Sequence, residues 1–159
     1  MVHMSKSKRN KLHSWSFVAI QAILLIVLVF MNSGIGPTVD RFPINGSFLQ
    51  LLGWVGILIS AFNIRTVLTA EPLPRKNGKL STGGLYKYVR HPMYTSVLLL
   101  SSGIAISSGS LLKYALVVSL AILFHYKANY EEHYLSEQYP EYKKYVSKTP
   151  RFIPFIKNR

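Results

Sequence analysis

Hydrophobic residues along the chain gather into long runs that are separated by polar stretches. Two runs, 14–31 and 47–64, are each about 18 residues long, which at helical rise spans about 27 Å and approaches the hydrocarbon thickness of a bilayer. The third run, 93–124, is apolar or small almost throughout. A single helix of that length would measure about 48 Å, which is too long for one crossing and short for two.

The charge distribution decides how the third run is expected to fold. The tail that follows it is basic, as are 1–13 and 65–91, and basic residues accumulate on the cytoplasmic side of membrane proteins. Only an even number of crossings returns the tail to that side. We therefore predict two short helices, 93–107 and 111–126, joined by a turn at 108–110, with both termini in the cytoplasm. Small residues along the first of these helices allow the pair to approach closely.

The predicted fold is an all-α integral membrane protein with about four transmembrane helices, the last two of which form a C-terminal hairpin. The chain divides into a basic cytoplasmic N-terminus, the first two transmembrane helices and a C-terminal half, at 1–13, 14–64 and 65–159. In the C-terminal half, 65–91 is a long polar loop in which Pro72 and Pro74 oppose helix formation. The stretch 127–146 predicts a polar helix that leaves the membrane, and 148–157 an amphipathic, Pro-punctuated segment at the interface.

Composition narrows the possible functions. The 159 residues are 49% hydrophobic and carry a net charge of +13, and no acidic residue lies inside an apolar run, as the cost of burying charge in a bilayer requires. Because no retention or transit signal is visible, the cell membrane is the default location. The absence of cysteine excludes disulfides, thiolate nucleophiles and Cys-based metal sites. His125 and His133 have no partners at metal-ligand spacing, and the basic residues form no long basic helix, so neither a metal nor a nucleic acid is predicted.

Two motifs go beyond membrane anchoring. The first runs from Gly83 to Tyr94 and contains Arg90 and His91 directly before a proline, which ends a preceding helix and suits the start of the next. Free backbone N–H groups at that helix start attract anions. The alternative is that Arg90 reaches lipid phosphates and that His91 simply occupies the interface.

The second motif is the carboxylate pair Glu131 and Glu132, just beyond the last apolar segment. A hairpin of the last two helices would bring the pair back to the membrane face that holds His91 and Tyr94. A carboxylate pair and a cationic cluster would then converge in one site. The alternative is an exposed helix face on which Lys127 pairs with Glu131 at i, i+4.

The ordered strings 80–94, 131–135, 139–145 and 150–154 resemble the isoprenylcysteine carboxyl methyltransferase and phospholipid methyltransferase superfamily. The resemblance covers about residues 70–157 and implies an integral membrane enzyme that uses S-adenosylmethionine, with 65–159 as the catalytic half and a cytoplasmic cofactor-binding loop. The cofactor contacts that it implies are Lys79, Leu80, Tyr86, His91, Pro92, Tyr94 and Glu131.

The resemblance also suggests how an acceptor is held. Lys127 stands where the family has a basic ligand of the substrate carboxylate, but lysine cannot grip a carboxylate bidentately as arginine does. A carboxylate acceptor is ionised at neutral pH and needs only an orienting cation, for which Arg90, Lys127 and Arg151 are candidates. An amine acceptor needs a base instead, for which Glu131, Glu132 and His91 are candidates. Arg90, Lys127 and Glu132 are therefore the predicted catalytic residues.

Several functions stay open on the sequence alone. The leading hypothesis is methyl transfer to a lipophilic or lipid-attached acceptor, an isoprenylcysteine-like carboxylate. The alternatives are methylation of an amine-headgroup phospholipid, an NADPH-dependent reductase similar to membrane sterol reductases, and a non-enzymatic small membrane transporter or scaffold. Apart from Lys113 near the start of the last predicted helix, the runs carry no charge, which offers a transporter no ion pathway. The acceptor and the oligomeric state are not readable from these residues.

Overall fold

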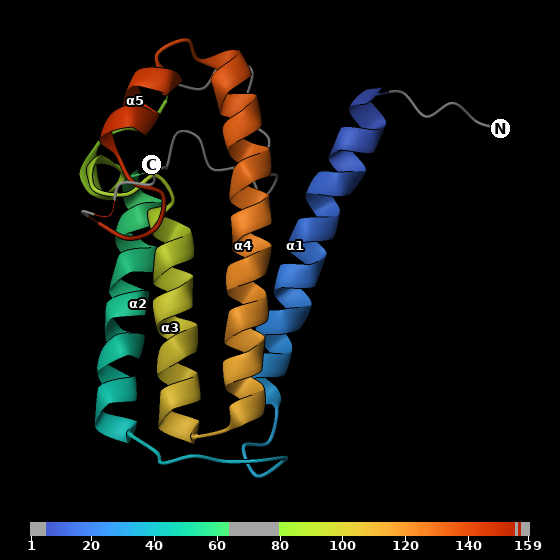
Figure 1. Cartoon of the computed structure of the whole chain (residues 1–159), viewed down its shortest axis with the longest axis vertical. Coiled ribbons are helices and arrows are strands. Elements are labelled where there is room, and N and C mark those ends of the chain that lie inside the picture. Colours follow the sequence, from blue (N-terminus) through green and yellow to red (C-terminus); the bar gives the residue numbers. More distant parts are fainter. Residues whose placement is uncertain (1–5, 64–79, 155, 157–159) are drawn as a thin grey trace, which may run out of the picture.

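Four long helices dominate the part of the chain that the computed structural model describes, residues 6–63, 80–154 and 156 (Figure 1). They are α1 (Lys6–Phe30), α2 (Pro43–Asn63), α3 (Pro92–Ser108) and α4 (Leu111–Gln138). A short 3-10 helix, η1 (Gly84–Lys87), precedes α3, and a short helix, α5 (Tyr142–Lys148), follows α4. The described residues contain no strand beyond one isolated bridge, so the all-α prediction is confirmed.

Two of these helices, α2 and α4, are long and apolar enough to cross a bilayer. Only 17% and 28% of their most apolar windows are buried, so most apolar side chains face outward, as bilayer helices require and soluble core helices avoid. The apolar part of α1, Ser14–Phe30, and the 17-residue α3 are shorter. The count of four crossings and the cytoplasmic orientation stay predictions.

The turn between the last two helices lies where the sequence predicts it. Gly109 ends α3 in the left-handed region with φ 64° and donates its amide to the carbonyl of Ala105. The loop between α1 and α2 packs against this turn, since the amide of Val39 donates to Gly109 at 2.8 Å. A Cβ on Gly109 would stand 2.4 Å from the Val39 carbonyl oxygen. Both the backbone conformation and the close approach therefore require glycine here.

The last long helix differs from the prediction. It does not end at 126 but continues to Gln138, so the polar helix predicted over 127–146 is an extension of α4 and is separate from α5. The physical reason is that nothing after Tyr126 breaks a helix until Pro140, which lacks the N–H that a helix needs. Glu131 and Glu132 therefore stand on a rigid extension, about 8 Å past the end of the apolar segment.

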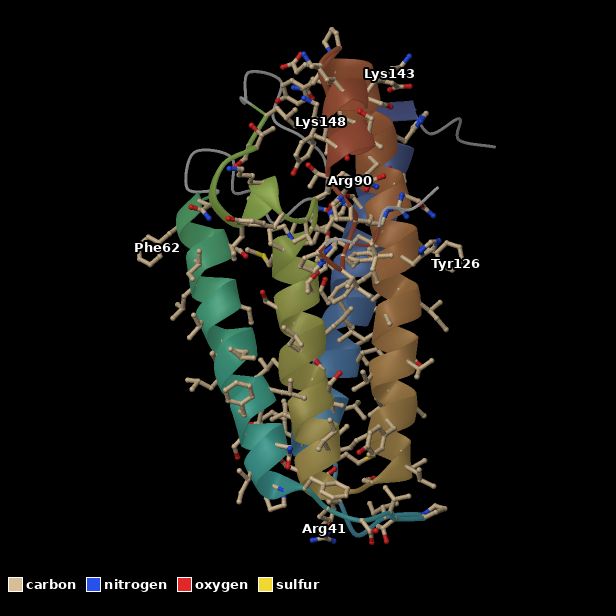
Figure 2. All side chains as sticks on the ribbon, turned by 60° about the vertical axis from the view of Figure 1, so that its left-hand side comes forward. Arg41, Phe62, Arg90, Tyr126, Lys143 and Lys148 are labelled. Carbon is tan, nitrogen blue, oxygen red and sulfur yellow. The ribbon has the colours of Figure 1, made fainter. Side chains whose placement is uncertain are left out.

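The two ends of the bundle differ in character. One end carries η1, α5 and the C-terminal segment, and the other carries the α1–α2 loop and the α3–α4 turn (Figure 1). Figure 2 shows Arg90, Lys143 and Lys148 at the first end and Arg41 at the opposite end. Between these ends, α2 and α3 lie side by side and α1 lies beside α4 (Figure 1). We call the first end the polar end.

Small residues set the spacing of α2 and α3. A Cβ on Gly53 of α2 would stand 2.6 Å from the backbone nitrogen of Leu100 in α3, a distance that real Cβ atoms do not reach. Gly46 lies against Gly103 in the same way. The two backbones therefore approach as closely as glycine permits, which fixes the distance between α2 and α3.

Gly53→Ala should lower stability by about 1–3 kcal/mol, because the added methyl group forces two helix backbones apart. Thermal unfolding in detergent measures the loss. Gly34→Ala is the control, since a Cβ there meets only the Asn32 side chain at 3.4 Å. Equal melting temperatures of the two variants would contradict the close α2–α3 packing.

Candidate active site

The predicted site residues meet at the polar end of the bundle. Arg90 and His91 precede α3, Tyr94 lies in its first turn, and Glu131 and Glu132 lie on the extension of α4. His91 occupies the N-cap position and the following proline the first helical position of α3, as predicted. The expectation that the hairpin brings the carboxylates to His91 and Tyr94 is confirmed by the contacts described below.

The C-terminal segment crosses the start of α3. The amides of Arg90 and His91 donate to the carbonyls of Pro150 and Arg151, at 2.9 and 3.1 Å. The Thr95 hydroxyl donates to the carbonyl of Phe152 at 2.8 Å. The tail predicted to lie along the membrane interface is therefore, over these residues, part of the site.

Glu132 is the centre of a buried ion cluster. Arg90 donates to it through Nε at 3.0 Å and Nη2 at 3.3 Å. Arg151 donates through Nε at 3.0 Å and Nη2 at 2.7 Å, and His91 Nε2 lies 2.9 Å from Oε1. The side chain of Glu132 is 13% exposed and that of Arg90 6%. The two guanidinium groups each bind the carboxylate bidentately, so nearly all of its hydrogen-bond acceptor capacity is occupied.

This environment holds Glu132 ionised. Burial alone would raise its pKa, but hydrogen bonds from His91 and Arg151, together with the charges of His91 and Arg90, lower the pKa to about 2. A carboxylate with so low a pKa is a poor proton acceptor at neutral pH. The geometry therefore favours a role for Glu132 in positioning the neighbouring residues. The catalytic role predicted for Glu132 stays a prediction.

Arg90 is occupied in the same way. Besides Glu132, it donates through Nη1 to the carbonyl of Thr149 at 2.6 Å and to that of Val146 at 3.2 Å. These bonds attach the end of α5 and the chain after it to the start of α3. Arg90 therefore ties the C-terminal segment to the site, and its predicted role as an orienting cation for the acceptor stays a prediction.

His91 bridges the two carboxylates. Its Nε2 contacts Glu132, and its Nδ1 lies 3.4 Å from Oε2 of Glu131. Burial alone would lower the pKa of His91, but hydrogen bonds with Glu131 and Glu132 raise it above the ordinary value. Two nitrogens that both face carboxylates can both donate only in the imidazolium form. These contacts favour the imidazolium form of His91, in which the ring donates to both carboxylates.

Glu131 faces a different part of the site. It accepts a hydrogen bond from the Tyr94 hydroxyl as well as from His91, and its side chain is 18% exposed. The Tyr94 ring stacks with the His91 ring, with centroids 5.3 Å apart, and with the Phe124 ring, with centroids 4.6 Å apart. Glu131 is therefore a carboxylate beside an aromatic wall, with fewer partners than Glu132.

Lys127 contacts Gln21 and Tyr94 rather than a carboxylate. Its Nζ donates to Oε1 of Gln21 in α1 at 2.9 Å and lies 5.1 Å from the centroid of the Tyr94 ring. Within the described part of the chain no ion pair joins Lys127 to Glu131, so the i, i+4 pair considered above does not form.

The remaining residues predicted to contact the cofactor lie before or at the start of α3, except one that lies outside the described residues. Tyr86 is buried in η1, and its carbonyl accepts a hydrogen bond from Tyr145 of α5. Pro92 is buried at the start of α3, and Leu80 is half-buried where the described chain resumes. Lys79 lies outside the described residues.

The sequence analysis missed several residues that complete the site. Gln21 had a visible signal, because it is the most polar side chain inside its apolar run. Asn129, which accepts a bond from Arg151 Nη1 at 2.6 Å, had none. Arg151 was predicted only as one of three candidate cations that could orient a carboxylate acceptor. Its contact with Glu132 could not be inferred from the sequence.

Comparisons with known proteins identify relatives. The sequence profile of a family described as phospholipid methyltransferase matches residues 44–142. The chain is 34% identical over 82 residues to protein-S-isoprenylcysteine O-methyltransferase B of Arabidopsis thaliana, covering 49% of this chain and 41% of the relative.

Two bacterial relatives have names from metal resistance. The chain is 32% identical over 147 residues to the nickel-cobalt-cadmium resistance protein NccN of Alcaligenes xylosoxydans xylosoxydans, covering 92% of this chain and 65% of the relative. It is 35% identical over 81 residues to the cobalt-zinc-cadmium resistance protein CzcN of Cupriavidus metallidurans, covering 50% and 38%. In all three cases the chain spans less than two thirds of the relative.

Glu132→Gln should lower stability by about 3 kcal/mol at pH 7, because it leaves two buried guanidinium groups without a counter-charge. In the unaltered protein the same contribution is present above about pH 4.5, the ordinary pKa, and is lost as the pH falls through about 2. Thermal unfolding in detergent between pH 7 and 2 measures both effects.

The control is Glu137→Gln, because the side chain of Glu137 is 62% exposed and its ion-pair partner His133, at 3.3 Å, is 67% exposed. This control should change stability by less than about 0.5 kcal/mol. A Glu132→Gln variant as stable as the control would show that the ion cluster does not hold the site together.

Proposed function

The chain belongs to the phospholipid methyltransferase family, and from this premise we propose that it is an integral membrane methyltransferase. The methyl donor is S-adenosylmethionine, and the acceptor is a lipophilic or lipid-attached molecule with a carboxylate group. The observation that carries the proposal is the convergence of Tyr94, His91 and Glu131 beside a buried ion cluster at the polar end of the bundle. Metal-resistance names describe a cellular outcome rather than a reaction, so the site chemistry carries the argument.

The donor set fits S-adenosylmethionine. A carboxylate accepts hydrogen bonds from a ribose diol or from an ammonium group. Glu131 offers a carboxylate that is partly exposed and that forms no ion pair with an arginine among the described residues. A sulfonium cation is favoured beside carboxylates and aromatic rings. Tyr94 contacts Glu131, and its ring stacks with those of His91 and Phe124. When bound, the cofactor supplies an electrophilic methyl group.

The residues of the chain then act chiefly by position. Transfer of a methyl group is an in-line displacement, so the protein must align donor and acceptor and exclude water. The ion cluster of Glu132 holds the start of α3 and the C-terminal segment in one arrangement. Tyr94 and Glu131 are thereby presented at a fixed geometry.

The protonation states favour a carboxylate acceptor over an amine. An amine must lose a proton before it can attack. Glu132 has its pKa lowered to about 2. Burial alone would lower the pKa of His91, but hydrogen bonds with Glu131 and Glu132 raise it and favour the imidazolium form. Neither is suited to remove that proton, whereas an ionised carboxylate needs no base. Methylation of an amine-headgroup phospholipid therefore remains the second candidate, with Glu131 as its base.

Titration of the purified protein with S-adenosylmethionine, S-adenosylhomocysteine and NADPH tests the cofactor class. We expect calorimetry to detect binding of both adenosyl compounds and none of NADPH. Glu131→Ala should weaken that binding about ten- to a hundredfold, because a charge-assisted hydrogen bond is lost. Glu137→Ala is the matched control and should bind normally. Binding of NADPH alone would favour a reductase, and binding of none of the three would favour a non-enzymatic protein.

The pH dependence of the single-turnover rate separates the two acceptor classes. With N-acetyl-S-farnesylcysteine as the acceptor, the rate should be nearly constant from about pH 6 to 8, because a carboxylate is ionised throughout. With phosphatidylethanolamine, turnover should be absent or should rise with pH as the ammonium group loses its proton. Turnover of phosphatidylethanolamine alone would move the proposal to the amine acceptor.

A further inference from the structure

A buried lysine without a partner lies at the end of the bundle opposite the polar end. Lys113 is in the first turn of α4, and the residue is 5% exposed. No hydrogen bond or ion pair joins it to another described residue. Among the described residues, the only acidic side chain outside the polar end is that of Asp40, in the α1–α2 loop. A buried charge is costly unless it is paired, so the ammonium group of Lys113 favours an anionic ligand.

The start of α4 has further donors without partners. Ser110 is the N-cap residue and is fully buried, and its hydroxyl neither caps the helix nor has another partner among the described residues. The amide of Leu111 donates to the carbonyl of Pro37 at 3.1 Å. The amides of Leu112 and Lys113 have no such backbone acceptor within the described chain. Free amides at a helix start carry partial positive charge and attract anions.

These donors lie on one side of the helix start. Ser110 and Lys113 are three residues apart and are therefore neighbours on one face of α4. Side chains of a helix lean toward its N-terminus, so the Lys113 side chain leans toward the turn that holds the free amides. An ammonium group has three donors, and none of them is used within the described residues. The charge, the helix dipole and the hydroxyl all favour an anion at this position.

The surroundings indicate that the anion belongs to a lipid. At the same end of the bundle, Phe30 closes α1 and is 80% exposed, and Ile44 in the first turn of α2 is 85% exposed. Apolar side chains so exposed are unfavourable in water and favourable in a bilayer. Arg41 lies beyond them at the tip of this end (Figure 2) and marks the aqueous side. Lys113 therefore lies near the boundary between hydrocarbon and water, which is where the phosphate groups of phospholipids are found.

We propose that the start of α4 binds the phosphate group of a phospholipid, with Lys113 as the cationic ligand and the first-turn amides as further donors. The site is at the opposite end of the bundle from Tyr94 and Glu131 (Figure 1), so this lipid is neither methyl donor nor acceptor, and the inference does not depend on the proposed function. The bound phosphate neutralises a buried charge where the α1–α2 loop packs on the α3–α4 turn. The lipid therefore stabilises this end of the bundle.

The test is thermal unfolding of the full chain in dodecyl maltoside with one of two lipids added. The probes are dioleoylphosphatidylglycerol and monogalactosyl dioleoylglycerol, which share their acyl chains, and only the first contains phosphate. A ligand that binds the folded state raises the melting temperature in a concentration-dependent way. We expect the unaltered protein to bind the phosphate lipid about tenfold more tightly than the galactolipid.

Lys113→Met removes the charge and keeps most of the side-chain length. The preference for the phosphate lipid should fall to about one. The melting temperature in lipid-free detergent should be unchanged or higher, because an unpaired buried charge is gone. Lys113→Arg should keep the preference, since a guanidinium group also binds phosphate. The matched control is Lys144→Met, because Lys144 is exposed on α5 at the polar end, and it should keep the preference as well.

Three outcomes would overturn the site. The first is equal stabilisation of the unaltered protein by the two lipids, which requires no variant. The second is a Lys113→Met protein that keeps the preference seen in Lys144→Met. The third is an equal rise in melting temperature with inorganic phosphate alone, which would assign the site to a soluble anion; no effect of inorganic phosphate supports the lipid.

Discussion

The carboxylate of Glu132, paired with two arginines and a histidine, is the interaction on which the polar end of the bundle depends. It joins three segments that are distant in the sequence: the start of α3, the extension of α4 and the chain after α5. The Arg90 bonds to the carbonyls of Val146 and Thr149 extend the same cluster into the backbone. Buried charges of this kind are costly singly and stable only as a complete set. The cluster therefore specifies one arrangement of the three segments, and its ion pairs do not contribute to stability independently of one another.

Two adjacent glutamates have different tasks because of helix geometry. Successive residues on a helix point about 100° apart, so Glu131 and Glu132 face different neighbours on either side of His91. Glu132 faces Arg90 and Arg151, whereas Glu131 faces Tyr94. Glu132 therefore holds the segments of the polar end together, and Glu131 retains the capacity to accept further hydrogen bonds. His91 lies between them and couples the position of one to that of the other.

Local signals made much of this fold predictable. The turn at 108–110 and the start of α3 after His91 follow from glycine and proline, whose effects extend over one or two residues. The length of α4 was mispredicted because the end of the apolar run was equated with the end of the helix. The backbone hydrogen bonds of a helix can form in water as well as in lipid, so the helix continues beyond the apolar run. Contacts such as that of Gln21 with Lys127, which are 106 residues apart, depend on how the helices pack and have no local signature. Lys79 lies outside the described residues, so its role stays a prediction from resemblance.

An experimental structure of the protein with S-adenosylhomocysteine bound tests the central claim most directly, because the claim is a division of roles between neighbouring carboxylates. The account predicts that the ligand contacts Glu131 and lies against Tyr94, while Glu132 keeps its bonds with Arg90 and Arg151. A ligand that displaces either arginine from Glu132, or that binds away from Glu131, would contradict it.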